Sequence, residues 1–170
     1  YRGDVNKELN EVIDIQREDD GTAQQVSEAD VAENSPIAQT VNLLLEFAIR
    51  SQASDIHIEP REGFVQVRYR VDGVLKEVNQ LPRNVLGALV SRIKILANLK
   101  IDERRVPQDG RFKIKVAGKQ YALRVSTLPI ADGESVVMRI LDESNQAVTL
   151  QELGYWGHSL KIITHAIAEP

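Results

Sequence analysis

The sequence predicts an α+β domain, in which helices flank an antiparallel sheet built from hairpins. Three observations predict this class. Segments 36–52 and 82–96 repeat apolar residues at helical spacing. Several shorter segments alternate apolar and polar residues at the period of a strand. Glycine-containing turns separate most of the alternating segments, as in a sheet made of hairpins.

The first 34 residues are expected to lie outside this domain. Residues 1–35 hold ten acidic and three basic side chains, a net charge of −7, and their low hydrophobicity suits a flexible acidic linker or the tail of an upstream domain. Residues 36–170 hold fifteen acidic and eighteen basic side chains, a net charge of +3. The contrast favours a locally anionic partner for the folded part, although a solvated charged surface is the simpler explanation.

The first helix is expected to begin at Ser35-Pro36, an N-cap followed by proline at the first helical position. It continues to Gln52 with one apolar face made of Ile37, Val41, Leu44, Leu45 and Ala48. Strict alternation then predicts a short strand over 54–60, which Pro60 ends.

A β-hairpin is the strongest local signal in the chain. Its first strand, 64–70, places Val65, Val67 and Tyr69 on one face, and its second covers 74–78. Asp72-Gly73 lies between them, a dipeptide that favours a tight turn.

A second helix is expected to open at Pro82, with its apolar stripe running from Val85 to Leu96. Arg92, Lys94 and Lys100 are expected off that stripe or at its edge. A basic loop, 104–111, follows, with a turn at Asp109-Gly110. Three more strands are predicted over 111–116, 120–127 and 134–141, and a final amphipathic helix over 158–168.

Five motifs in this order resemble the domain that precedes the ATPase core of bacterial type II secretion and type IV pilus assembly ATPases. They are Ser54-Asp55-Ile56-His57-Ile58-Glu59-Pro60, Arg70-Val71-Asp72-Gly73, Arg105-Val106-Pro107-Gln108-Asp109-Gly110-Arg111, Leu123-Arg124-Val125-Ser126-Thr127-Leu128-Pro129, and Gly133-Glu134 with Val136-Val137-Met138-Arg139-Ile140-Leu141. The resemblance covers 36–170, and secretion and pilus assembly both stay open because they share the motifs.

The resemblance implies a PAS-like domain over 35–153, and a connector and helix over 154–170 that lead to a RecA-like ATPase domain. It implies a parent that is a hexameric ATPase using ATP and magnesium. The implied partners are the RecA-like domain of the same or a neighbouring subunit and the inner-membrane secretion or pilus platform. The implied location is cytoplasmic, peripheral to the inner membrane.

This chain itself is not expected to hydrolyse ATP. It contains no Gly-x-x-x-x-Gly-Lys-Ser/Thr sequence, which would cradle the phosphates and place a hydroxyl on magnesium. Gly118-Lys119 is its only Gly-Lys pair, with Lys113 where the first glycine belongs and Gln120 after the lysine. We interpret it as a hairpin turn.

Arginines are the candidate functional residues. Alternation puts Arg111 on the polar face of one strand and Arg124 on that of the next, and a hairpin at Gly118 brings Arg124 opposite Arg111 or Lys113. In the resembling family, arginines of this domain approach nucleotide phosphates held by an ATPase domain, which implies Arg124 and Arg139 first and Arg111 next. The alternative is ordinary surface ion pairs with Asp109, Glu134 or Asp132.

The remaining candidates concern interfaces. Asp55, His57 and Glu59 share one strand face, where a metal site is conceivable but an interface or structural role is expected. Arg104 and Arg105 are expected at an interface, as is Trp156, which is either a docking anchor or a cap on the core.

Two other functions compete with nucleotide contact. The chain could be an interaction module that links an upstream adaptor domain to the ATPase ring. A nucleic-acid binder is not expected, because aromatic residues are 5% of the chain and do not interleave with the basic strand residues.

Overall fold

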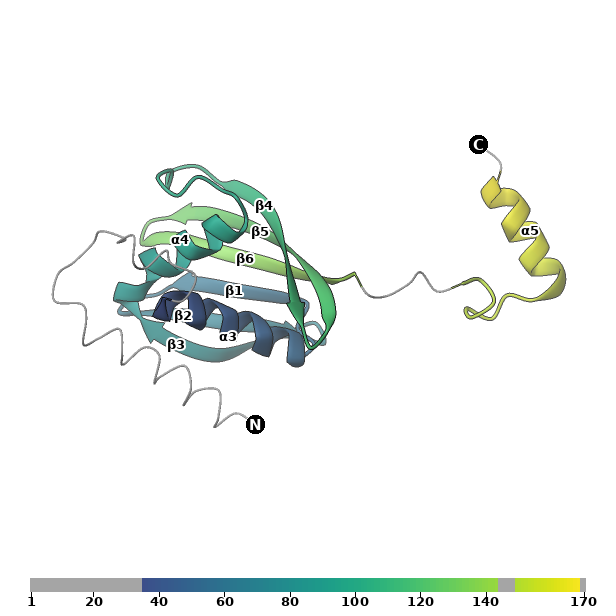
Figure 1. Ribbon diagram of the computed structural model, residues 1–170, viewed down its shortest axis with the longest axis horizontal. Coiled ribbons are helices and arrows are strands. Elements are labelled where there is room, and N and C mark those ends of the chain that lie inside the picture. The colour runs from purple at the N-terminus through teal and green to yellow at the C-terminus, as the bar shows by residue number, and fades with distance from the viewer. Residues whose placement is uncertain (1–34, 144–148, 169–170) are drawn as a thin grey trace.

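The computed structural model describes residues 35–143 and 149–168; the expected acidic segment 1–34 lies outside them. Six strands form one antiparallel sheet in the order β3-β2-β1-β6-β5-β4, and two helices, α3 and α4, cover one of its faces (Figure 1). The predicted α+β class is therefore confirmed.

The sheet consists of two three-stranded meanders. The first contains β1 (Asp55–Pro60), β2 (Phe64–Val71) and β3 (Val74–Pro82). The second contains β4 (Gln108–Val116), β5 (Lys119–Ile130) and β6 (Gly133–Asp142). The pairing of β1 with β6 joins the two meanders into one sheet.

Local sequence explains the ends of these elements. The Oγ atom of Ser35 accepts a hydrogen bond from the Ala38 N–H at 3.2 Å, so the predicted N-cap of α3 (Pro36–Arg50) is confirmed. The turns at Asp72-Gly73 and Ala117-Gly118 have positive φ at both residues, as a two-residue hairpin turn requires. The only Gly-Lys pair of the chain thus belongs to a hairpin.

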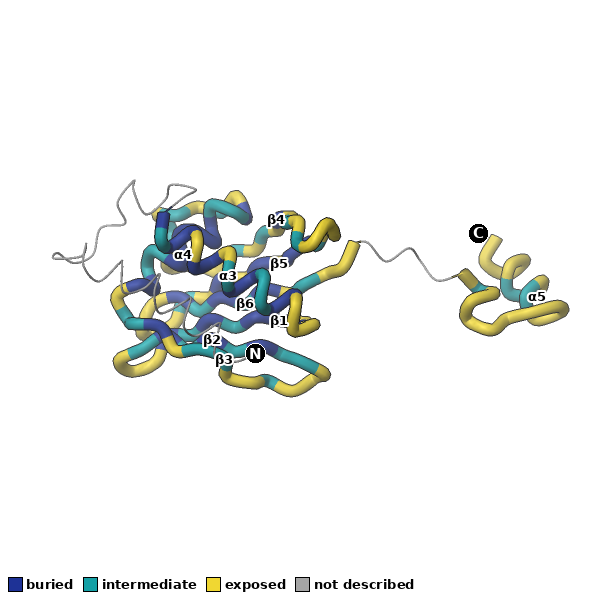
Figure 2. The backbone as a smooth tube through the Cα atoms, turned by 60° about the horizontal axis from the view of Figure 1, so that its bottom comes forward, coloured by how far each residue is buried: buried dark blue, intermediate teal, exposed yellow. Residues whose placement is uncertain are grey.

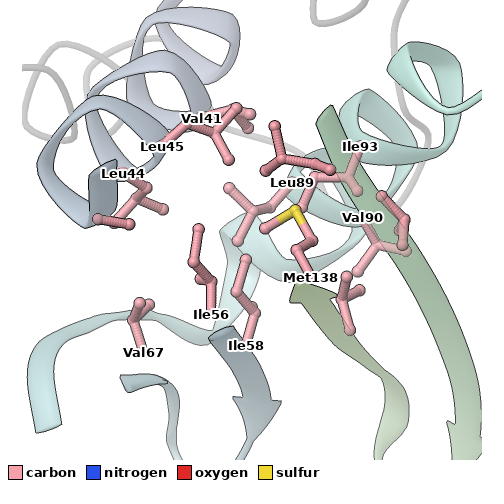
Figure 3. Close-up of a cluster of buried hydrophobic side chains, with 14 of the residues drawn as sticks. Val41, Leu44, Leu45, Ile56, Ile58, Val67, Leu89, Val90, Ile93 and Met138 are labelled. Atoms are coloured by element: carbon pink, nitrogen blue, oxygen red, sulfur yellow. The ribbon is translucent and has the colours of Figure 1, made fainter. Parts of the chain in front are cut away.

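The core lies between the sheet and the two helices (Figure 3). Val41, Leu44 and Leu45 of α3 point toward Ile56 and Ile58 of β1, and α4 (Leu86–Leu96) adds Leu89, Val90 and Ile93. The buried Tyr69 hydroxyl donates a 2.6 Å hydrogen bond to the Leu44 carbonyl, which ties β2 to α3. Burial raises the pKa of that phenol well above its ordinary value, so it stays a donor.

The second helix begins later than predicted. Pro82 has extended dihedral angles and ends β3, a short 3₁₀ helix covers Arg83–Val85, and α4 starts at Leu86. The reason is Leu81, which is buried and pairs with Val65 in the sheet. Core packing therefore extends the strand beyond the predicted end at residue 78.

The expectation that Lys94 lies off the apolar stripe is wrong. Its side chain is 1% exposed, and its Nζ lies 2.5 Å from Oε1 of Glu134 in β6, which is 7% exposed. The same Nζ donates a 2.7 Å hydrogen bond to the Glu103 carbonyl. Arg92 is buried too. The Lys94 stem packs with the core while its charge joins α4 to β6 and to the following loop.

The predicted turn at Asp109-Gly110 is also wrong, because both residues lie inside β4 and pair with Ser126 and Val125. A Cβ atom at position 110 would lie 2.7 Å from the Ala97 carbonyl oxygen. Glycine is thus needed here for close approach to the end of α4. The basic loop accordingly ends before Gln108.

The loop over 97–107 is held by Gln108. The Gln108 side chain accepts the Lys100 N–H at 2.9 Å and donates to the carbonyls of Lys100 and Glu103. Together with Lys94, these bonds satisfy the Lys100 N–H and the carbonyls of Lys100 and Glu103, and they hold this part of the loop beside β4.

The C-terminal segment forms the predicted helix, α5 (Gly157–Ala168), which has no buried residue (Figure 2). Within the described residues, no helix is long and apolar enough to span a membrane.

Replacing Gly110 tests the close approach. We expect Gly110→Ala to lower the free energy of unfolding by about 1–3 kcal/mol, because the new methyl group meets backbone that cannot rotate away. Urea unfolding measures this. The control is Gly87→Ala in α4, where nothing lies within 4 Å of the new Cβ; it should leave stability unchanged or raise it. Equal effects of the two substitutions would contradict the account.

Replacing Lys94 tests the buried ion pair. Lys94→Met should cost about 3–5 kcal/mol, because it leaves the Glu134 carboxylate buried without its partner. Adding Glu134→Leu should recover much of that loss, since no uncompensated charge then remains. A double-mutant cycle by urea unfolding gives the coupling, and strictly additive losses would show that the pair does not interact.

Candidate functional site

Four arginines and one aspartate lie in register across the sheet face that the helices leave open. Arg70 pairs with Asp55, Asp55 with Arg139, Arg139 with Arg124, and Arg124 with Arg111. We call these five residues the arginine row. Of the two partners predicted for Arg124, the structure selects Arg111. Their chain neighbours Ile56, Leu123 and Met138 are buried beneath the helices, so alternation turns the row outward.

The arginine row carries unbalanced charge. Directly opposed residues of an antiparallel pair bring their Cβ atoms to about 4.5–5.5 Å, where like charges destabilise the sheet. Arg111, Arg124 and Arg139 occupy three adjacent strands in this way. Within the described residues, neither Arg111 nor Arg124 makes an ion pair or a side-chain hydrogen bond. The arrangement suits an anionic ligand that would offset the repulsion.

Arg139 differs from the other two, because it is bound to Asp55. Its Nε lies 3.0 Å from Oδ1 of Asp55, while its side chain is 67% exposed. Arg139 is therefore not buried against a helix. Nε of Arg70 lies 3.4 Å from the other Asp55 oxygen.

Asp55 stays ionised at neutral pH. Burial would raise the pKa of its carboxyl group, but hydrogen bonds from Arg139 and Ser54, with the charges of Arg139 and Arg70, lower that pKa below its ordinary value.

All members of the row except Arg70 line an open groove of about 580 Å³. Asp55, Arg139, Arg124 and Arg111 line it, and Asp109 and Ser126 lie beside them. Three guanidinium groups and two carboxylates therefore share the groove. The Ser126 hydroxyl donates to Asp109, so this carboxylate is engaged with a neutral partner.

The surface ion pairs weighed for these arginines do not form among the described residues. Asp109 accepts from Ser126, Glu134 pairs with Lys94, and the Asp132 carbonyl accepts from Arg83.

Asp55, His57 and Glu59 do share the open face. The carboxylates of Asp55 and Glu59, however, bind arginines. Glu59 accepts from Arg68 at 2.6 Å and from Arg61 at 2.9 Å. Burial lowers the pKa of His57 below its ordinary value. The negative charge of Glu59 raises that pKa, but its effect is smaller than that of burial. In the part of the chain that the structure describes, no three metal-ligating side chains come together.

The other predicted interface residues lie apart from the groove. Arg104 and Arg105 are exposed on the loop over 97–107 and do not line it. Trp156 is 69% exposed, so within the described residues it does not cap the core, and its role as a docking anchor stays a prediction.

Sequence reasoning missed Arg70 as a member of the row and Asp55 as the partner of Arg139. Arg70 and Asp55 face each other across the β1–β2 hairpin. The signal that could have found this pair is the alternation along the two predicted strands, which puts both residues on the polar face. Arg139 and Asp55 are 84 residues apart, and nothing local in the sequence indicates that β1 pairs with β6.

Comparison with known proteins assigns the chain to a protein family. The sequence model of the family described as "Type II/IV secretion system protein" matches residues 30–170. Type II secretion system protein E of Xanthomonas campestris pv. campestris is 48% identical over 141 residues, which cover 83% of this chain and 25% of that protein.

Two further relatives agree. The type IV pilus assembly ATPase PilB of Myxococcus xanthus is 42% identical over 168 residues, covering 98% of this chain and 29% of that protein. Type II secretion system protein E of Pseudomonas aeruginosa is 46% identical over 138 residues, covering 81% of this chain and 28% of that protein. The chain thus spans between a quarter and a third of the length of these relatives. It belongs to the type II/IV secretion system protein family, as its five motifs predicted.

Proposed function

We propose that this chain is the non-catalytic part of a hexameric secretion or pilus-assembly ATPase. It packs on the ATPase domain of a neighbouring subunit and supplies Arg124, Arg139 and Arg111 to the phosphates of the nucleotide bound there. The observation that carries this proposal is the register of the arginine row, which aligns three guanidinium groups on one open face.

Guanidinium chemistry supports a phosphate ligand. A guanidinium group offers paired N–H donors that match two phosphate oxygens, and such charge-assisted bonds are stronger than neutral ones. Arginines placed this way stabilise the charge that develops on the equatorial oxygens during phosphoryl transfer. Arg111 and Arg124 have no described ion-pair partner that a phosphate would need to displace.

The parent's ATP and magnesium would bind to its RecA-like domain. The chain has no phosphate loop of its own, so its arginines act only where another domain presents the nucleotide. The remaining partners that we propose are the other subunits of the ring and the inner-membrane secretion or pilus platform. The corresponding location is cytoplasmic, peripheral to the inner membrane.

An interaction module that touches no nucleotide is the second candidate. The exposed arginines of the loop over 97–107 favour it, because Lys94 and Gln108 fix this loop at a distance from the row. In that case Arg104 and Arg105 would contact the adaptor or the ring, and the arginine row would be dispensable for hydrolysis.

We expect the 170-residue chain to show no ATPase activity, because it lacks the loop that cradles the phosphates. A phosphate-release assay with ATP and magnesium tests this. Turnover that survives repurification and rises in proportion to chain concentration would contradict it.

Replacing the row arginines tests their role in the parent. In the full-length protein, Arg124→Ala or Arg139→Ala should slow hydrolysis by a factor of ~10³, judging from arginine fingers elsewhere. Stability should change little, by about 0.5 kcal/mol for the exposed Arg124 and by less than ~1 kcal/mol for the Arg139 pair. Hydrolysis and melting temperature are measured side by side.

The matched control is Lys115→Ala, which removes an exposed cation from the same face of β4 outside the row. It should leave hydrolysis unchanged. If the arginine variants behave like this control, or lose activity only as they unfold, the row has no part in catalysis.

A further inference from the structure

Asp55 binds both of its neighbours in the arginine row. Oδ1 accepts a 3.0 Å hydrogen bond from Nε of Arg139. Oδ2 lies 3.4 Å from Nε of Arg70 and accepts the Ser54 hydroxyl at 2.9 Å. Asp55 is only 6% exposed although it lies on the open face. This carboxylate is thus largely shielded from solvent, and both of its oxygens have partners.

The charge of the row is divided as a result. Arg139 and Arg70 share one internal anion, whereas Arg111 and Arg124 have none among the described residues. Asp109, the other carboxylate in the groove, is bonded to Ser126 and makes no ion pair with a described residue. Two guanidinium groups are thus open, and two are partly neutralised.

We propose that Asp55 is the resident anion of the groove and sets its specificity. It neutralises Arg139, leaves Arg111 and Arg124 as the open phosphate-binding pair, and releases Arg139 only to a ligand that carries several negative charges. The inference rests on the proposed function, because it takes the row to bind phosphate groups. Its ligand class is the polyphosphate chain of a nucleoside triphosphate, and anions of low charge are disfavoured.

The geometry allows this exchange at little cost. Asp55 contacts Arg139 through Nε alone, so the two terminal amino groups of that side chain remain open to a phosphate. Arg139, the partner that would move, is 67% exposed, so its ion pair with Asp55 is screened by water and weak, whereas bidentate contacts to phosphate are strong. When Arg139 turns to the ligand, Asp55 keeps Arg70 and Ser54. Breaking a buried ion pair is usually unfavourable because it leaves a buried charge without a partner. Here no buried charge would be left unpaired.

Titration of the 170-residue chain with inorganic tripolyphosphate at low salt, followed by calorimetry, tests the inference. Asp55→Asn keeps the size of the side chain and an oxygen acceptor for Arg139 but removes the competing charge. We expect the affinity to rise about fivefold, the effect of one exposed ion pair. The matched control Asp109→Asn removes a charge from the same groove without touching Arg139 or Arg70, and should raise the affinity less than about twofold.

A second substitution shows whether Asp55 changes the affinity through Arg139 or only through the overall charge of the groove. Arg139→Gln should lower tripolyphosphate affinity in the wild-type chain by less than Arg124→Gln does, because Asp55 competes with the ligand for Arg139, and it should abolish the gain in the Asp55→Asn chain. Equal gains from Asp55→Asn and Asp109→Asn would overturn the inference, and so would a gain that survives Arg139→Gln. Melting temperatures show whether each variant is folded.

If Asp55→Asn does not fold, arginine variants that keep Asp55 still test the inference. There Arg124→Gln should weaken binding several times more than Arg139→Gln, and equal losses would overturn the inference. The proposed function fails separately. If tripolyphosphate binds neither the wild-type nor the Asp55→Asn chain, the resident-anion role fails and the nucleotide role in the assembled parent is untouched. If Arg124→Ala leaves hydrolysis by the parent unchanged, the nucleotide role fails, and the nucleoside triphosphate fails with it as the ligand of the groove, even where Asp55→Asn raises the affinity for tripolyphosphate.

Discussion

Burial of one sheet face beneath α3 and α4 fixes the register of the strand pairs, and the candidate site depends on that register. A slip of one residue in any strand would turn its core side chains toward water and its polar ones toward the helices. Because Ile56, Met138 and Leu123 must face the helices, their neighbours Asp55, Arg139 and Arg124 must face outward. The strand pairing then places these three residues in one line. The core therefore holds the arginines on the open face of the sheet, and its burial offsets the repulsion between them.

The segment Gln108-Asp109-Gly110-Arg111 shows how tightly the site is connected to the rest of the domain. Gln108 holds the loop over 97–107, Gly110 lets β4 approach the end of α4, and Arg111 completes the row. Lys94 reaches the same loop from α4 and is paired with Glu134 at the start of β6. A shift of α4 would thus act on β4 and β6, two of the strands that carry row arginines.

Local sequence predicted most of the fold and part of the site. The period of apolar residues located the strands and α3, and the turn at Gly118 narrowed the partner of Arg124 to Arg111 or Lys113, because hairpin register depends on few residues. Three features could not be predicted from local sequence. The β1–β6 pairing, and with it the Asp55–Arg139 contact, joins residues far apart in the chain. Lys94 has the polarity of a surface residue but lies in the core because Glu134 compensates its charge. Gly110 follows aspartate as in a turn, yet serves close packing instead.

The role proposed for the arginine row is to complete a nucleotide site on another subunit. Mixing two inactive forms of the full-length parent tests this most directly. One form carries Arg124→Ala, and the other has a disabled phosphate loop but an intact row. Mixed rings contain interfaces at which an intact row faces an intact phosphate loop. The account predicts that mixing and reassembly restore hydrolysis, with a dependence on the mixing ratio that follows the fraction of such interfaces. Mixed rings that form but stay as inactive as either form alone would contradict it.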